Sequence, residues 1–155
     1  MLVRSLVRAV AVLSLVALGC HGSHGSSPSE PARRDALSRV SISPAEGTIL
    51  PYGSTTVDFS VRVHYSFASA DRGSVGLIVY PGSAGRPAGV PILTEPSFFP
   101  VEGQEGDTTL RVIVHFETAE PALPKGARVT LDFSLFPEGV KQTTIGFTSQ
   151  YQLGS

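Results

Sequence analysis

The chain of 155 residues contains one cysteine, one methionine, no tryptophan and no asparagine. A single cysteine has no partner for an intramolecular disulfide, and without asparagine there is no N-x-[ST] glycosylation site. The only methionine is Met1, which excludes a thioether site for copper in the rest of the chain. A folded domain in this chain therefore depends on its hydrophobic core alone.

Charge is also scarce, with 12 basic and 13 acidic residues. No basic stripe is present that could contact a phosphate backbone, so nucleic acid is not an expected partner. The glycine cluster Gly82–Gly85 lacks the lysine and the helix of a phosphate-binding loop and is interpreted as a turn. We find no catalytic motif, and no cofactor is expected.

The first 20 residues have the order of a secretory signal. Arg4 and Arg8 precede a mostly apolar stretch, residues 9–18, and small Gly19 comes directly before Cys20. The run Ala-Leu-Gly-Cys that ends at Cys20 resembles the lipobox of bacterial lipoproteins. The resemblance implies that residues 1–19 are a signal peptide cut before Cys20, which receives a diacylglyceryl thioether and is then acylated on its new amine. The protein would be anchored by lipid at the cell envelope.

Two other interpretations of this segment are open. The apolar stretch is about half the ~20 residues that a membrane-spanning helix needs, which argues against a permanent transmembrane anchor. Ordinary cleavage would leave a free thiol, and Ala17 and Leu18 stand in the reverse of the usual lipobox order. A lone thiol in an oxidising compartment is a liability, which favours lipidation. His21 is not aspartate, and by the same resemblance the destination is the outer membrane if the host is Gram-negative.

Residues 20–38 are expected to form the lipidated cysteine and a flexible linker. The segment after Cys20 is rich in serine, glycine and proline and nearly free of apolar residues. A coil of this composition spans about 20–25 Å. His21 and His24 have H-x-x-H spacing, but without further ligands they make a poor metal site, and no metal is predicted.

From residue 39 onward the hydrophobic period is two, which predicts strands. Three strands with one apolar face are predicted at 56–67, 109–118 and 127–136. A fourth begins at Val75, and because both of its phases are apolar, we expect a central strand covered on both faces. Weaker strands are predicted at 39–43, 47–50 and 143–151, and no helix is predicted.

About seven short strands separated by proline and glycine are typical of an all-β sandwich. Residues 39–155 resemble the immunoglobulin-like and fibronectin type III-like sandwiches of bacteria, through the entry Val40–Thr48, the long alternating strand Val57–Phe67 and the strand order after it. The resemblance implies a single antiparallel sandwich. The Cys…Trp…Cys core of antibody domains is missing, and a jelly roll or small barrel would give similar alternation.

Two histidines, His64 and His115, fall on the outward phase of long strands. These strands would be neighbours in an immunoglobulin-like order, so the imidazoles could share a face with Asp58. That face is the basis of an alternative function, a metal-dependent or hydrolytic enzyme. The strand register decides whether the three residues meet, and the sequence leaves the register open.

The segment 81–107 is long, rich in proline and glycine, and carries four apolar residues of interest: Ile92, Leu93, Phe98 and Phe99. One interpretation is that 90–94 and 98–101 are short edge strands whose phenylalanines cap the core. The other is that these residues form an exposed patch that binds a partner.

The preferred function is a non-enzymatic module at the bacterial envelope that binds a protein or glycan or serves as an accessory subunit. This step is an analogy with the fold. A mechanical role of a lineage-specific lipoprotein is a further possibility.

Overall fold

The computed structural model describes residues 32–140 and 146–154, which form two β-sheets and one turn of 3-10 helix. The predicted signal peptide 1–19, Cys20 and most of the predicted linker lie outside the described residues. In chain order the elements are β1 (Ala36–Ser43), β2 (Ile49–Pro51), β3 (Thr56–Ser66), β4 (Arg72–Ser83), β5 (Arg86–Pro87), β6 (Thr94–Glu95), β7 (Phe98–Glu102), β8 (Glu105–His115), η1 (Phe116–Thr118), β9 (Arg128–Pro137) and β10 (Gly146–Gly154).

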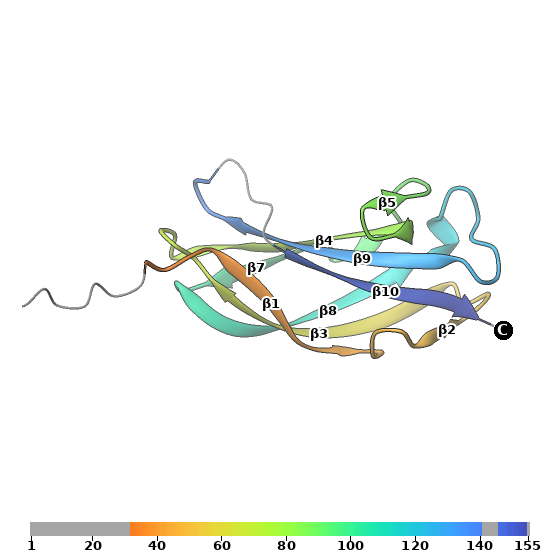
Figure 1. Cartoon of the computed structure of the whole chain (residues 1–155), viewed down its shortest axis with the longest axis horizontal. Helices are drawn as coiled ribbons and strands as arrows, with labels where there is room; N and C mark the ends of the chain where they lie inside the picture. The colour runs from red at the N-terminus through yellow and green to blue at the C-terminus, as the bar shows by residue number, and fades with distance from the viewer. Residues whose placement is uncertain (1–31, 141–145, 155) are drawn as a thin grey trace, which may run out of the picture. The chain divides into compact units, whose positions relative to one another are not determined.

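The strands form two sheets that lie against each other (Figure 1). The first sheet has the order β1-β3-β8-β6, and the second has the order β2-β10-β9-β4, with β5 and β7 both paired to β4. Every pairing is antiparallel except that of β2 with β10. The two sheets correspond to the A-B-E-D and C-F-G sheets of an immunoglobulin domain. The predicted immunoglobulin-like sandwich is confirmed.

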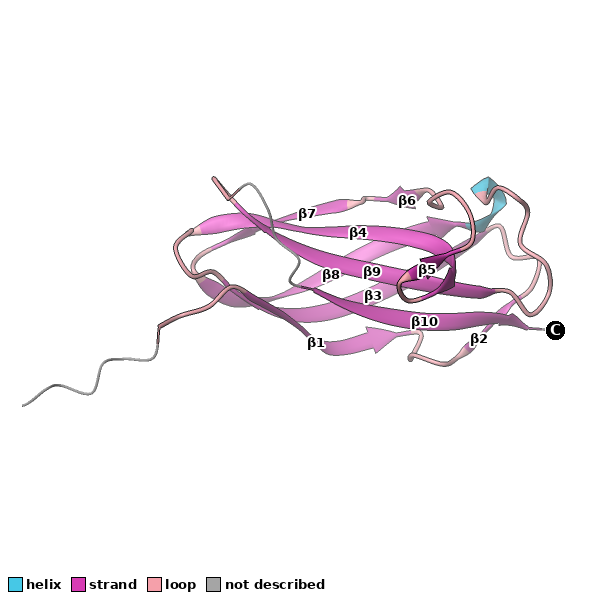
Figure 2. Cartoon of the chain, turned by 45° about the horizontal axis from the view of Figure 1, so that its top comes forward, coloured by secondary structure: helices cyan, strands magenta, loops and turns pink. Residues whose placement is uncertain are grey.

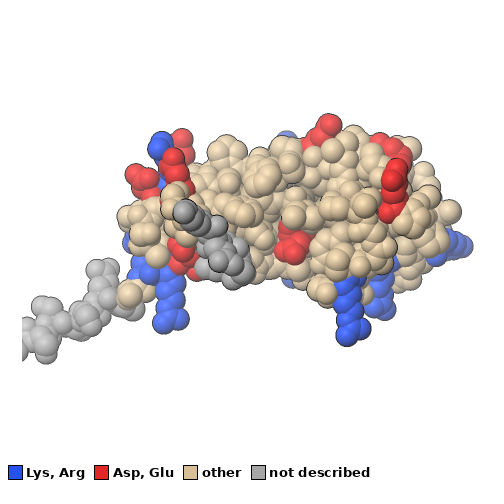
Figure 3. All heavy atoms as spheres, turned by 90° about the horizontal axis from the view of Figure 1, so that it is seen from above, with Lys and Arg blue, Asp and Glu red and all other residues tan. Residues whose placement is uncertain are grey.

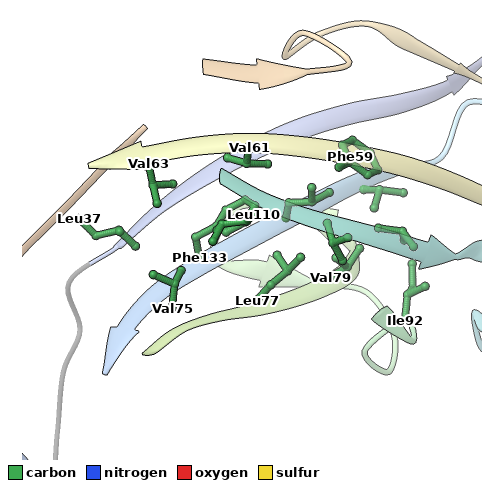
Figure 4. Close-up of a cluster of buried hydrophobic side chains, with 14 of the residues drawn as sticks. Leu37, Phe59, Val61, Val63, Val75, Leu77, Val79, Ile92, Leu110 and Phe133 are labelled. Atoms are coloured by element: carbon green, nitrogen blue, oxygen red, sulfur yellow. The ribbon is translucent and has the colours of Figure 1, made fainter. Parts of the chain in front are cut away.

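The core lies between the sheets and is built from the inward phase of each long strand. On β3 and β8, Phe59 pairs with Val112 and Val61 with Leu110, and all four side chains are buried. They face Leu77 and other buried side chains of β4 and β9 (Figure 4). Alternation forms these strands because each has one face toward the core and one toward water.

The prediction for β4 is confirmed in position, and for its outer face it holds except at Ile78. The strand lies between β9 on one side and β5 and β7 on the other, so it is central. On its outer phase Gly76 and Tyr80 are buried, whereas the side chain of Ile78 is 56% exposed. This side of the strand is therefore covered at two of the three positions and open at Ile78, which leaves one apolar side chain in water.

The domain also begins earlier than the predicted boundary at Arg39. Strand β1 starts at Ala36, and Leu37 is buried opposite Tyr65. The Ser66 hydroxyl donates a hydrogen bond to the carbonyl of Arg34 at 2.8 Å. The prediction that the flexible linker reaches residue 38 is therefore wrong, because one leucine and the backbone around it join the sandwich.

Other strand ends differ by a few residues. Strand β8 runs from Glu105 and ends at His115, where η1 replaces the last predicted strand residues. The predicted strand at 47–50 is β2, and the predicted strand at 143–151 is β10, its first residues lying outside the described part.

Candidate functional site

An apolar groove of about 480 Å³ lies on the outer face of the sheet formed by β4 and β9. Its floor comes from the outward phase of these two strands, and its wall comes from the segment between β5 and β7 and from η1. The lining residues are Gly76, Leu77, Ile78, Pro91, Ile92, Leu93, Thr94, Ser97, Phe98, Thr118, Asp132, Ser134 and Phe136.

Four large apolar side chains in this groove are accessible to water. Phe98 is 60% exposed, Ile78 56%, Leu93 49% and Phe136 39%. The rings of Phe98 and Phe136 contact each other at a centroid distance of 5.8 Å. Single exposed apolar residues are ordinary, whereas several gathered in one groove mark an interaction surface.

The two rings lie over β4 because Gly76 has no side chain. A Cβ atom at Gly76 would lie 2.6 Å from the Phe136 ring, closer than Cβ atoms in proteins approach other atoms, and 3.1 Å from the Phe98 ring, which is a tight contact. Phe98 pairs directly with Gly76 across β7 and β4. The glycine therefore lets the two rings close one end of the groove.

The wall of the groove is anchored to both sheets. The backbone N–H of Ile92 donates to the carbonyl of Val79 at 2.7 Å, and that of Leu77 donates to the carbonyl of Ser97 at 2.8 Å. Between these two points β6 pairs with β8 of the other sheet (Figure 2). The predicted edge strand 98–101 is present as β7, whereas of the predicted strand 90–94 only Thr94 lies in a strand, β6.

The structure separates the four predicted partner-binding residues into two pairs. Phe98 and Leu93 are exposed in the groove, whereas Ile92 is buried and Phe99 packs against the core. Phe98 and Phe99 are neighbours on a strand, so their side chains point to opposite faces. Ile78 and Phe136 were missed, although both are apolar residues on the outward phase of a strand.

Asp132, which the sequence also did not single out, lies among the lining residues on β9. It is half-buried, flanked by Ile78 of β4 and Thr148 of β10, and no hydrogen bond or ion pair joins its carboxylate to another described residue. Burial raises the pKa of Asp132 above its ordinary value. A charged group without a partner in an apolar groove is a common mark of a binding site.

We expect Asp132→Asn to raise the melting temperature at pH 7. Because burial raises the pKa of Asp132, the folded protein holds this proton more tightly than the unfolded chain does. The stability that this protonated carboxyl group contributes is fully present below its ordinary pKa and is lost as the pH rises through the raised pKa. At pH 3 the variant and the wild type should therefore have the same melting temperature. A lower melting temperature at pH 7 would show that the carboxylate has a stabilising partner.

The histidines predicted to share a face with Asp58 are separated by the strand register. His64 lies opposite Asp107, whereas His115 lies opposite Thr56 at the other end of the β3–β8 pair, roughly 26 Å away. The expected three-residue face is therefore not a single site.

His64 belongs instead to a cross-strand ion-pair cluster. Its Nδ1 atom lies 2.8 Å from Asp107, its Nε2 atom lies 3.4 Å from Glu105, and Arg62 contacts Asp107 at 3.0 Å. Hydrogen bonds from His64 and Arg62 lower the pKa of Asp107. All of these groups are exposed, so the cluster is a surface salt-bridge network with a small effect on stability.

His115 is held by η1 and β6. Its Nδ1 atom lies 3.0 Å from Glu117, and its Nε2 atom, 3.6 Å from Glu95, is buried without a hydrogen bond. Across residues 32–140 and 146–154, no three His, Cys, Asp or Glu side chains are grouped in a way that could hold a metal ion. In the same residues no helix has the length and hydrophobicity to span a membrane.

Fold and site together define the domain as an immunoglobulin-like β-sandwich with an exposed apolar groove. No protein-family model matches the chain, and no curated protein matches it. Among solved structures the chain is similar to the periplasmic chaperone SfaE, with 16% identity and a TM-score of 0.42. The match covers 76% of this chain and 56% of the chaperone chain, so the chain spans little more than half of that protein. The strand order of the two sheets is that of an immunoglobulin-like sandwich.

Proposed function

We propose that the chain is a non-enzymatic, lipid-anchored envelope protein whose sandwich domain binds a partner protein through the groove on β4 and β9. The observation that carries this proposal is the convergence of four exposed apolar side chains in one groove. Aromatic side chains in such a position supply most of the binding energy in protein interfaces. A glycan is the weaker candidate, because most of the exposed surface of the groove is apolar.

The sequence of residues 1–20 supports the location. A signal peptide at 1–19 and lipidation at Cys20 would hold the domain at the cell envelope, and at the outer membrane in a Gram-negative host. These residues lie outside the described part of the structure, so this element of the proposal depends on the sequence alone.

An enzyme built on His64, His115 and Asp58 is the less favoured alternative. General acid–base or metal chemistry needs its groups within hydrogen-bonding or ligand distance of one reacting atom. The register of β3 and β8 keeps the two imidazoles at opposite ends of the strand pair. Asp58 lies opposite Ile113, beside Arg111, in a separate surface depression.

Photocrosslinking in intact cells tests the groove directly. A photoreactive amino acid in place of Phe98 should capture a discrete partner, and the same amino acid in place of Val40, which is 51% exposed on the other sheet, should not. Adding Ile78→Ser should reduce capture at position 98 by about tenfold or more, because it removes an exposed apolar side chain from the same groove. Surface substitutions of this kind change stability little, which a melting curve checks. Equal capture from positions 98 and 40 would contradict the proposal.

A further inference from the structure

Asp132 is a lone charge on a face that is otherwise uncharged around it. Its nearest neighbours on this face are Ile78 on β4, Thr148 on β10, and Thr130 and Ser134 along β9, and none of them is ionisable. The wall of the groove adds Leu93, Thr94 and Thr118, which are also uncharged. The carboxylate therefore has no counter-ion among the described residues that surround it.

The charged groups of this face lie toward its ends. Arg72 and Glu138 form an ion pair at one end of β4 and β9, and Arg128 lies at the other end. Arg128 is roughly 13 Å and Glu138 roughly 20 Å from Asp132 along the strand. Seen from above, most of the visible surface is uncharged, with the densest groups of charged side chains toward the two ends and a few charged side chains near the middle (Figure 3). Both separations exceed the Debye length of roughly 8 Å in physiological salt.

An unpaired, half-buried carboxylate lowers the stability of the fold. A threonine or serine at position 132, like the neighbours along β9, would fit this face of the sheet without that cost. A cation supplied by a partner would remove that cost on binding. The apolar surroundings would also strengthen the ion pair, because they exclude water from it. The rings of Phe98 and Phe136 lie in the same groove, where the aliphatic stem of a lysine or an arginine could pack on them.

We infer that the groove binds a segment of a partner protein that carries a lysine or arginine next to large apolar residues, and that the Asp132 carboxylate pairs with that cation. The inference rests on the proposed function, since it names the partner chemistry for the same groove. A partner protein fits this groove better than a second copy of the chain or a membrane surface does. A symmetric contact between two copies of this face would bring two Asp132 carboxylates together. An anionic lipid surface would be repelled by the same carboxylate.

Selection from a phage-displayed library of random linear peptides tests the inference without knowledge of the partner. The target is the full chain in nanodiscs of neutral phosphatidylcholine, compared with Asp132→Asn and Asp132→Lys. We expect peptides selected on the wild type to combine leucine, isoleucine or phenylalanine with one lysine or arginine. The basic residue should be lost from the selection on Asp132→Asn, and acidic residues should replace it on Asp132→Lys.

Affinity measurements on one selected peptide complete the test. Asp132→Asn should weaken its binding about tenfold, as expected for the loss of one partly buried ion pair. Asp58→Asn, the same change on the outer face of the other sheet, should leave binding unchanged. The affinity should also fall as the pH is lowered through the raised pKa of Asp132.

The outcomes separate the inference from the proposed function. Apolar peptides without a basic residue that still require Phe98 and Ile78 would overturn the role of Asp132 and leave the groove as a binding site. Selected peptides that bind Phe98→Ser and Ile78→Ser as well as they bind the wild type would overturn both. Basic enrichment that persists in Asp132→Asn would also overturn the inference, because the cation would then pair elsewhere.

Discussion

Replacing Phe133 by alanine should lower the free energy of unfolding by about 3–5 kcal/mol. Phe133 is fully buried at the centre of β9, and its ring stacks on Phe147 at a centroid distance of 4.8 Å. The substitution removes a large apolar surface. It also leaves a cavity between the two sheets, which the surrounding side chains fill only in part. Since domains of this size are stable by about 5–15 kcal/mol, the loss is a large fraction of the total. Urea denaturation followed by circular dichroism measures it.

The matched comparison uses one more buried residue and one on the outer face. Phe59→Ala should behave like Phe133→Ala, because Phe59 is buried on β3 and packs edge-on against Tyr151 at 5.1 Å. Arg62→Ala, on the outer face of the same strand, removes only an exposed ion pair with Asp107 and should cost less than about 1 kcal/mol. Similar losses for Phe59→Ala and Arg62→Ala would contradict the assignment of inner and outer faces.

The strands and their faces could be predicted because the physics that forms them is local. In β3, Phe59 and Val61 alternate with Ser60 and Arg62, and only one arrangement buries the first pair and hydrates the second. The same holds for β8 and β9. The full sheet order was not predicted, and only the resemblance to immunoglobulin-like domains implied that the strands at 56–67 and 109–118 are neighbours, as β3 and β8 are.

The register between strands could not be predicted in this way. His64 and His115 are on the outward phase, as expected, but their positions along the β3–β8 pair depend on how far the two strands slide. The alternation of apolar and polar residues fixes the face of each side chain, but it is kept when one strand slides by two residues along the other. The sequence therefore placed both imidazoles on the correct face and could not show that they are far apart.

The groove was predicted only in part, for a related reason. The apolar character of Phe98 and Leu93 was visible, but a sequence does not show whether another layer covers the outer side of a sheet. Ile78 was interpreted as a covered residue of a central strand, although its side is open to water. Asp132 escaped notice because an aspartate on the outward phase of a strand is ordinary until its neighbours are known.

The second large effect is expected at Cys20, where Cys20→Ser should abolish the incorporation of labelled palmitate into the protein. The thioether requires the cysteine sulfur, and a serine hydroxyl does not replace it. Without the acyl chains the protein should also lose the detergent-phase partitioning of a lipoprotein, because each buried methylene contributes about 0.8 kcal/mol to membrane binding. Ser23→Ala, a change in the same segment that keeps the cysteine, should be labelled as the wild type is.

The absence of any other cysteine makes the rival interpretation equally easy to test. If an ordinary signal peptidase removed the segment, Cys20 would carry a free thiol, and a maleimide reagent added to cells with a permeabilised envelope would label the wild-type chain. If the sulfur is a thioether, the same reagent finds no thiol anywhere in the protein. Maleimide labelling together with absent palmitate would contradict the lipid anchor. The groove on β4 and β9 would then belong to a protein free to diffuse, and a partner would have to be sought beyond the membrane surface.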